Sequence, residues 1–102
     1  MMDKQLKNKI AIVTGGGSGI GRAISLLFAQ SGAKVHILDI NKDYGEKVVQ
    51  EIKKLNCNSQ SHACDISNSD QVNTAIQKII SEDGAIDILV NNAGIAQEKS
   101  FL

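Results

Sequence analysis

The sequence lacks an excess of charge of either sign and lacks long apolar runs. Eleven basic residues balance eleven acidic ones, which argues against a nucleic-acid or anionic-membrane partner. The first apolar run, residues 10–13, is four residues long. A signal peptide needs a longer apolar core, and a membrane helix needs about 20 apolar residues. We therefore expect a cytoplasmic protein with no nucleic-acid or membrane partner.

Cysteines are also scarce. Cys57 and Cys64 are the only two, and in a cytosolic chain they are expected to be reduced thiols. With His62 they form the spacing C-x4-H-x-C, which matches no common zinc pattern. We expect no metal site, and small side chains beside a strand explain this segment adequately.

The pattern that is present alternates short apolar segments with amphipathic ones. Strands are predicted at 10–13, 34–39, 59–64 and 86–90, with one amphipathic helix between each successive pair. This βαβαβαβ order predicts an α/β fold, a partial Rossmann-type doubly wound parallel sheet with strand order 3-2-1-4. The polar third strand suits a sheet edge, whereas the apolar fourth strand suits a place between two neighbours. We interpret residues 1–102 as the N-terminal part of one dinucleotide-binding domain.

Capping signals and apolar spacing predict where the helices begin and how they face. Asn41 is the predicted N-cap of the second helix, and Ser67 begins a capping-box pattern for the third. Tyr44, with Val48, Ile52 and Leu55, is expected on the apolar face of the second helix.

A glycine-rich turn follows the first predicted strand. Gly15 permits a sharp turn, Gly19 permits close approach of a pyrophosphate, and Gly21 permits tight helix packing. The free N–H groups of the first helical turn would face the phosphates. A P-loop is excluded because Arg22 and Ala23 stand where Lys and Ser or Thr are needed. The alternative, a flexible turn that binds nothing, is disfavoured by the strand and helix on either side.

A carboxylate ends the second predicted strand. Asp39 lies 18 residues after Gly21, where an acid accepts hydrogen bonds from the adenosine ribose. A 2′-phosphate would meet a like charge there, so NAD is favoured over NADP. Alone, Asp39 could equally be a solvated acid near a helix N-terminus.

Four segments together resemble the short-chain dehydrogenase/reductase family: TGGGSGIG, Asp39, Asp65-Ile66 and the Asn-Asn-Ala-Gly run at 91–94. The resemblance covers essentially the whole chain, about two-fifths of a typical member. It implies an oxidoreductase that transfers hydride between a nicotinamide cofactor and an alcohol or carbonyl substrate. The cofactor-binding residues expected from the turn, Asp39 and the resemblance are Thr14, Gly15, Ser18, Gly19, Ile20, Gly21, Asp39, Asp65, Ile66, Asn92, Ala93 and Gly94.

The resemblance also implies individual roles. Ser18 is neutral where NADP-preferring members often carry a basic residue. Asp65 would bond the adenine amino group and Ile66 would add a backbone contact, while residues 92–94 would run past the ribose and nicotinamide. Asn91 looks structural, tying the fourth strand to its neighbours. In isolation, Asp65 could simply be a capping acid and Asn91-Asn92 a turn.

The catalytic residues of the family have no counterpart in the sequence. Members use a tyrosine whose pKa is lowered by a lysine four residues later; here the only tyrosine is Tyr44, and Val48 stands four residues on. His36 and His62 lie in predicted strands, where packed or edge-exposed imidazoles are expected. We assign no catalytic residue and expect residues 1–102 alone to be inactive.

Three functions stay open at this point. The first is an oxidoreductase whose remaining sequence is not shown, with a small alcohol or carbonyl substrate and a homo-oligomeric state expected for the complete protein. The others are a non-catalytic nucleotide-binding module and a regulatory or isomerase-like relative, because fold does not determine chemistry. The first is favoured because residues 95–102 look like the start of a further loop and helix. Nothing identifies the substrate.

Overall fold

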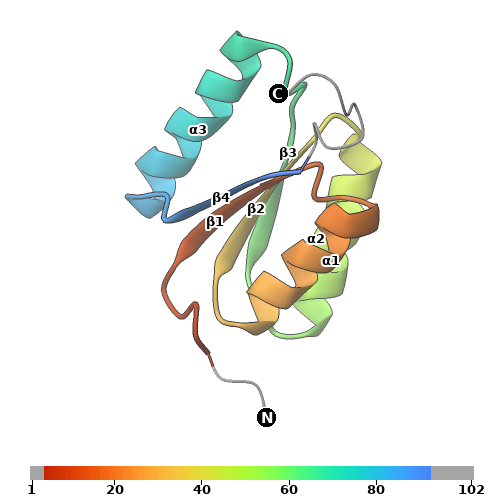
Figure 1. Cartoon of the computed structure of the whole chain (residues 1–102), viewed down its shortest axis with the longest axis vertical. Coiled ribbons are helices and arrows are strands. Elements are labelled where there is room, and N and C mark those ends of the chain that lie inside the picture. The colour runs from red at the N-terminus through yellow and green to blue at the C-terminus, as the bar shows by residue number, and fades with distance from the viewer. Residues whose placement is uncertain (1–3, 93–102) are drawn as a thin grey trace.

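Four parallel strands form a central sheet with helices on both faces (Figure 1). The computed structural model describes residues 4–92. Along the chain the elements are β1 (Ile10–Thr14), α1 (Gly19–Gln30), β2 (Lys34–Asp39), α2 (Lys42–Lys54), β3 (Ser59–Ala63), α3 (Ser69–Asp83) and β4 (Ile88–Asn91). The strand order β3-β2-β1-β4 and the parallel pairing confirm the predicted topology.

The first strand is buried on both faces, which explains its continuous apolar run. Ala11 and Val13 belong to the core beneath α1 and α2, whereas Ile12 belongs to the smaller core beneath α3. Figure 1 shows the same division, with α1 and α2 on one side of the sheet and α3 on the other. Because β1 lies between β2 and β4, the loop that follows it lies at the middle of the carboxyl edge of the sheet.

The helix starts agree with the predicted caps in one case and not in the other. The Asn41 side chain accepts a hydrogen bond from the Tyr44 N–H, which confirms it as the N-cap of α2. The N-cap of α3 is Asn68 rather than Ser67, because the Ser67 hydroxyl instead donates to the Asp65 carboxylate. Within residues 4–92, no helix has the length and apolar character needed to cross a membrane.

The buried face of α2 differs from the predicted one. Tyr44 and Leu55 are 49% and 43% exposed, so their placement on the apolar face was wrong. The residues that α2 buries are Gly45, Val48 and Ile52. A Cβ at position 45 would lie 2.4 Å from Ser61 Oγ. The absence of a side chain at Gly45 therefore lets α2 approach β3 closely, while the Tyr44 side chain is half exposed.

The fourth strand begins two residues later than predicted, at Ile88. Asp87 precedes it and exchanges hydrogen bonds with Ile10: the Ile10 N–H donates to Asp87 Oδ2 at 2.8 Å, and the Asp87 N–H donates to the Ile10 carbonyl at 2.8 Å. Among residues 4–92, β4 pairs only with β1, and the Leu89 side chain is 62% exposed.

Candidate functional site

The predicted site residues that the structure describes lie at the carboxyl ends of the four strands. Thr14 ends β1 and Asp39 ends β2, while Asp65 follows β3 and Asn92 follows β4. In parallel strands these ends share one edge of the sheet, the usual place for ligands in open α/β folds. Ala93 and Gly94 lie outside the described residues.

The glycine-rich turn combines one open and one crowded position. Gly19 has a φ of +54°, and a Cβ there would meet no atom of residues 4–92 within 4 Å. At Gly21 a Cβ would lie 2.0 Å from the Gly15 carbonyl oxygen and 2.6 Å from Asn92 Nδ2. The helix therefore approaches the turn closely at Gly21, while the backbone at Gly19 is exposed to an incoming ligand.

The start of α1 is suited to an anion. Its N-cap, Ser18, has an extended backbone and makes no side-chain capping hydrogen bond. No acidic residue lies in the first turn, so no carboxylate there competes for the N–H groups and the positive end of the helix dipole. A phosphate would be stabilised at this position by both.

Ser25 links α1 to the glycine-rich turn through hydrogen bonds, and it was not identified from the sequence. Its side chain is fully buried, and its hydroxyl lies 2.9 Å from the Gly21 carbonyl and 3.3 Å from the Gly16 carbonyl. A serine four residues along a helix carries no sequence signal for this role, because the second contact depends on how the turn folds back over the helix.

Asp39 is buried and accepts a hydrogen bond from a main-chain donor at each carboxylate oxygen. It is 9% exposed, so it is not the solvated acid considered as an alternative. The Gly17 N–H donates to Oδ2 at 3.0 Å and the Asn41 N–H donates to Oδ1 at 2.8 Å. The carboxylate thus joins the glycine-rich turn to the connection between β2 and α2.

Asp65 does not cap the helix that follows it, as its simpler possible role required: the N-cap of α3 is Asn68, and Asp65 instead holds the turn before that helix. Its Oδ1 accepts hydrogen bonds from the Ser67 hydroxyl at 2.7 Å and the Ser67 N–H at 3.0 Å. These bonds hold the pKa of Asp65 below its usual value. The Asp65 N–H donates to Gln71 Oε1 at 2.8 Å. Its contact with adenine stays a prediction.

Three isoleucines near this edge are unusually exposed for apolar side chains. Ile20, in the first turn of α1, is 65% exposed, and Ile66, after β3, is 37% exposed. Ile40 was not predicted, yet it is 71% exposed and directly follows Asp39. The signal that could have identified it is an apolar residue placed after the last residue of a buried strand, where the chain leaves the sheet. Exposed apolar side chains beside a polar turn suit the flat faces of a heterocyclic ligand.

The contacts of Asn91 and Asn92 agree with a structural role for the first and a turn contact for the second. Thr14 Oγ1 lies 3.3 Å from both Asn91 Oδ1 and the Val90 carbonyl oxygen, which ties β4 to β1. Asn92 Nδ2 donates to the Gly15 carbonyl at 3.2 Å. The end of β4 therefore helps to shape the glycine-rich turn.

The two histidines form a packed pair away from this edge. His36 is fully buried; its Nε2 lies 2.5 Å from Asp83 Oδ2 and its Nδ1 lies 3.0 Å from His62 Nε2. Burial lowers the pKa of both rings, that of His62 to about 4. Imidazoles packed between the strands and α3 agree with the structural role expected for them.

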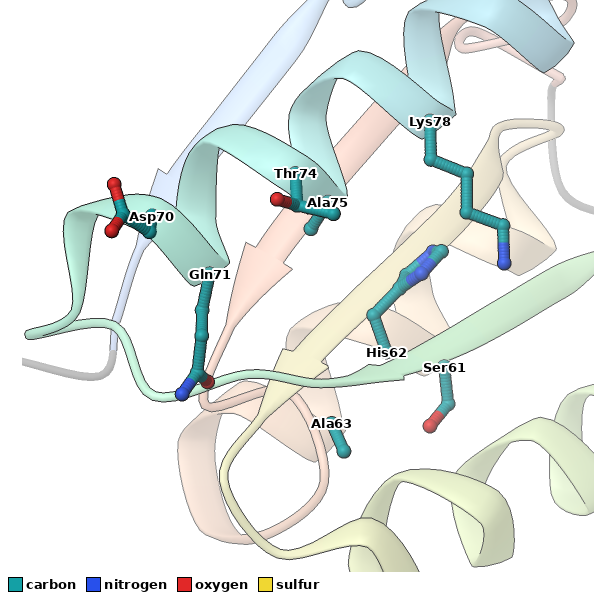
Figure 2. Close-up of a pocket in the computed structure, with 8 residues that line it drawn as sticks. All are labelled: Ser61, His62, Ala63, Asp70, Gln71, Thr74, Ala75 and Lys78. Atoms are coloured by element: carbon teal, nitrogen blue, oxygen red, sulfur yellow. The ribbon is translucent and has the colours of Figure 1, made fainter.

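His62 also borders an open groove of about 520 Å³ between β3 and α3 (Figure 2). The groove is lined by Ser61, His62, Ala63, Asp70, Gln71, Thr74, Ala75 and Lys78. None of these is a predicted cofactor residue. In Figure 2 the Lys78 side chain extends toward the strand that carries His62, whereas Asp70 points away from it. The groove is thus separate from the glycine-rich turn.

The cysteines are unpaired thiols. Cys64 is buried and Cys57 is half-buried, and burial raises the pKa of the Cys64 thiol. Among residues 4–92, no group of three or more His, Cys, Asp or Glu side chains is placed to hold a metal ion.

Comparison with known proteins agrees with the fold and with the geometry of this edge. The family model for short chain dehydrogenases matches residues 9–102. A 3-oxoacyl-(acyl-carrier-protein) reductase from Chlamydia muridarum is 44% identical over 102 residues, which is 99% of this chain and 41% of that protein. The chain therefore spans about two-fifths of the length of this curated relative.

Solved structures of the same family also match this chain, and two of them contain different cofactors. A 7α-hydroxysteroid dehydrogenase in complex with NADH and 7-oxo glycochenodeoxycholic acid matches with a TM-score of 0.83 and 40% identity, over 87% of this chain and 35% of that one. A metagenomic short-chain oxidoreductase in complex with NADP matches with a TM-score of 0.85 and 36% identity, over 88% of this chain and 41% of that one. The chain belongs to the short-chain dehydrogenase family.

Proposed function

We propose that this chain is the nicotinamide-dinucleotide-binding part of an oxidoreductase that interconverts an alcohol and a carbonyl compound. The observation that carries the proposal is the open backbone at Gly19, at the uncapped positive end of α1. A pyrophosphate needs this combination of space, N–H donors and positive potential. Membership of the short-chain dehydrogenase family supports the same function.

The rest of the cofactor would lie along the carboxyl edge of the sheet. Asp39 would receive the adenosine ribose hydroxyls, while Asp65 and the exposed side chains of Ile40 and Ile66 would border the adenine. Ile20 would lie on the nicotinamide side. When bound, the cofactor supplies or accepts the hydride, and the residues described here bind and orient it. We assign none of them a proton-transfer role.

Within this proposal, NAD is the preferred cofactor. The buried carboxylate of Asp39 would repel a 2′-phosphate, and Ser18 offers no positive charge. Arg22 is the only arginine in the sequence, and its guanidinium is paired with the Glu51 carboxylate. Glu51 therefore already offsets the charge of this guanidinium.

The test uses the complete protein with purified NADH and NADPH. Fluorescence titration should show NADH binding, and a panel of alcohols and carbonyl compounds should show NAD-dependent turnover. No binding of either dinucleotide would refute the proposal. NADH binding without turnover across the panel would instead favour the non-catalytic nucleotide-binding module. Residues 1–102 alone should turn over no substrate.

We also propose that the complete protein is a homo-oligomer in the cytoplasm. Light scattering after size-exclusion chromatography measures the first property, and cell fractionation measures the second. A monomeric complete protein would contradict the oligomer prediction without affecting the proposed chemistry.

A further inference from the structure

The Asp39 carboxylate makes two hydrogen bonds inside the protein before any ligand is considered. One oxygen accepts from the Gly17 N–H at 3.0 Å and the other from the Asn41 N–H at 2.8 Å. Both donors belong to the main chain, and Asp39 itself is buried. The carboxylate is therefore a bridge between two loops, in addition to being the expected acceptor for a ribose.

The packing around Gly17 leaves the turn little freedom to take another position. A Cβ at Gly17 would lie 2.8 Å from Asp39 Oδ2 and 2.7 Å from the Cβ of Tyr44. The neighbouring Gly15 N–H donates to the Leu38 carbonyl at 2.7 Å. Two hydrogen bonds thus anchor the turn to the end of β2, and only the Gly17 bond depends on a side chain.

We propose that Asp39 is a positioning residue for the phosphate-binding turn, in addition to its expected contact with the ribose. The inference rests on the proposed function, because it concerns the same cofactor site. An ionised carboxylate has about four acceptor positions, so two internal bonds leave room for ribose hydroxyls. Asp39 holds Gly17, and through it the start of α1, in the position that receives the pyrophosphate.

This role has a consequence that ribose recognition alone does not have. Loss of the carboxylate weakens binding of adenine nucleotides that carry no ribose hydroxyl at all. It also weakens NADP along with NAD, because both cofactors place a pyrophosphate on the same turn. Removing the negative charge does not by itself convert the site to NADP.

The experiment compares ADP with 2′,3′-dideoxy-ADP on the complete protein and on Asp39→Asn, by isothermal titration calorimetry. An asparagine can accept only one of the two bonds, since its NH₂ group faces a main-chain donor. A bond to a charged acceptor contributes enough that we expect affinity for dideoxy-ADP to fall about fivefold or more. Asp43→Asn is the matched control: it removes the same charge from an exposed position in the first turn of α2.

A second measurement does not depend on any ligand. Amide hydrogen exchange of Gly17 should be slow in the parent and faster in Asp39→Asn, while exchange in the core of β1 is unchanged. Circular dichroism checks that the variant is folded. If Asp39→Asn does not fold, Asp39→Ser takes its place, because a serine hydroxyl is too short to reach Gly17.

The outcomes separate this inference from the proposed function. Parental affinity of Asp39→Asn for dideoxy-ADP, with weaker binding of ADP only, would limit Asp39 to ribose recognition and overturn the inference. Fast amide hydrogen exchange of Gly17 in the parent protein would also overturn the inference. Failure of the parent to bind ADP and NAD would refute the proposed function itself, whatever the exchange data show.

Discussion

Replacing Gly19 with valine tests the phosphate site most directly, because this position separates binding from folding. In the part of the chain that the structure describes, no atom lies within 4 Å of a Cβ built there, so the new side chain meets no neighbour in it. Its cost to the fold comes from the backbone, which has a φ of +54°. A residue with a Cβ pays about 1–2 kcal/mol in this region, which lowers the Tm of a domain of this family's size by about 2–8 °C.

The cost to cofactor binding should be much larger. The valine methyl groups would occupy the space that a pyrophosphate needs to reach the N–H groups of the first turn of α1. Loss of two hydrogen bonds to a charged phosphate costs about 3–6 kcal/mol, which is more than about a hundredfold in affinity. NADH fluorescence titration measures the loss, and circular dichroism with thermal melting measures the fold.

Gly84→Val is the matched control. Gly84 has a φ of +86° and likewise no described protein atom within 4 Å of its built Cβ, but it caps the far end of α3. Its variant should lose similar stability and keep parental affinity. Folded Gly19→Val that binds NADH like the parent would show that the phosphates lie elsewhere. Equal loss of affinity in both variants would show that backbone strain, rather than blocked space, is responsible.

Three further predictions follow from the same contacts. The parent should bind NAD at least about tenfold more tightly than NADP by calorimetry, because a 2′-phosphate would meet the buried carboxylate of Asp39; equal affinities would contradict this. Gly21→Ala should lower the free energy of unfolding in urea by about 1–3 kcal/mol, since its Cβ would lie 2.0 Å from the Gly15 carbonyl oxygen; an unchanged midpoint would contradict that crowding. Burial lowers the pKa of His36, and that of His62 from 6.5 to about 4, so the unfolded state binds protons more readily. Stability should be full above about pH 6.5 and fall as the pH drops toward 4, and His62→Gln should flatten this part of the Tm profile.

The topology was predictable from the sequence because the residue composition of each strand reflects how far that strand is buried in the sheet. The run at 10–13 is apolar throughout because β1 is covered on both faces. Within residues 4–92, the polar strand Ser59–Ala63 pairs only with β2 and lies at the edge, as its composition indicated. These are properties of single segments, and strand alternation with helices then leaves few possible connections.

Details that depend on two segments at once were less predictable. The apolar spacing of α2 was consistent with Tyr44 in the core, but α2 places Gly45, and not Tyr44, against Ser61 of β3, and Tyr44 is 49% exposed. Ser67 and Asn68 are both good caps, and only the bond from Ser67 to Asp65 decides between them. The spacing of residues along one helix predicts neither the exposure of Tyr44 nor the choice of N-cap, because both depend on contacts with another segment.

Asp39 shows where this difference affects a functional prediction. From the sequence, it is an acid at the right distance from a glycine turn, and its removal should admit NADP by relieving repulsion. The structure adds a main-chain donor, Gly17, 22 residues earlier. No residue pattern can point to that bond, because every residue except proline carries the same N–H group. If the bond positions the turn, removal of the carboxylate has two opposing effects. It relieves the repulsion of the 2′-phosphate, but it also loosens the phosphate-binding turn, which weakens NAD and NADP alike. The sign of the change in NADP affinity therefore depends on a contact that only the folded chain defines.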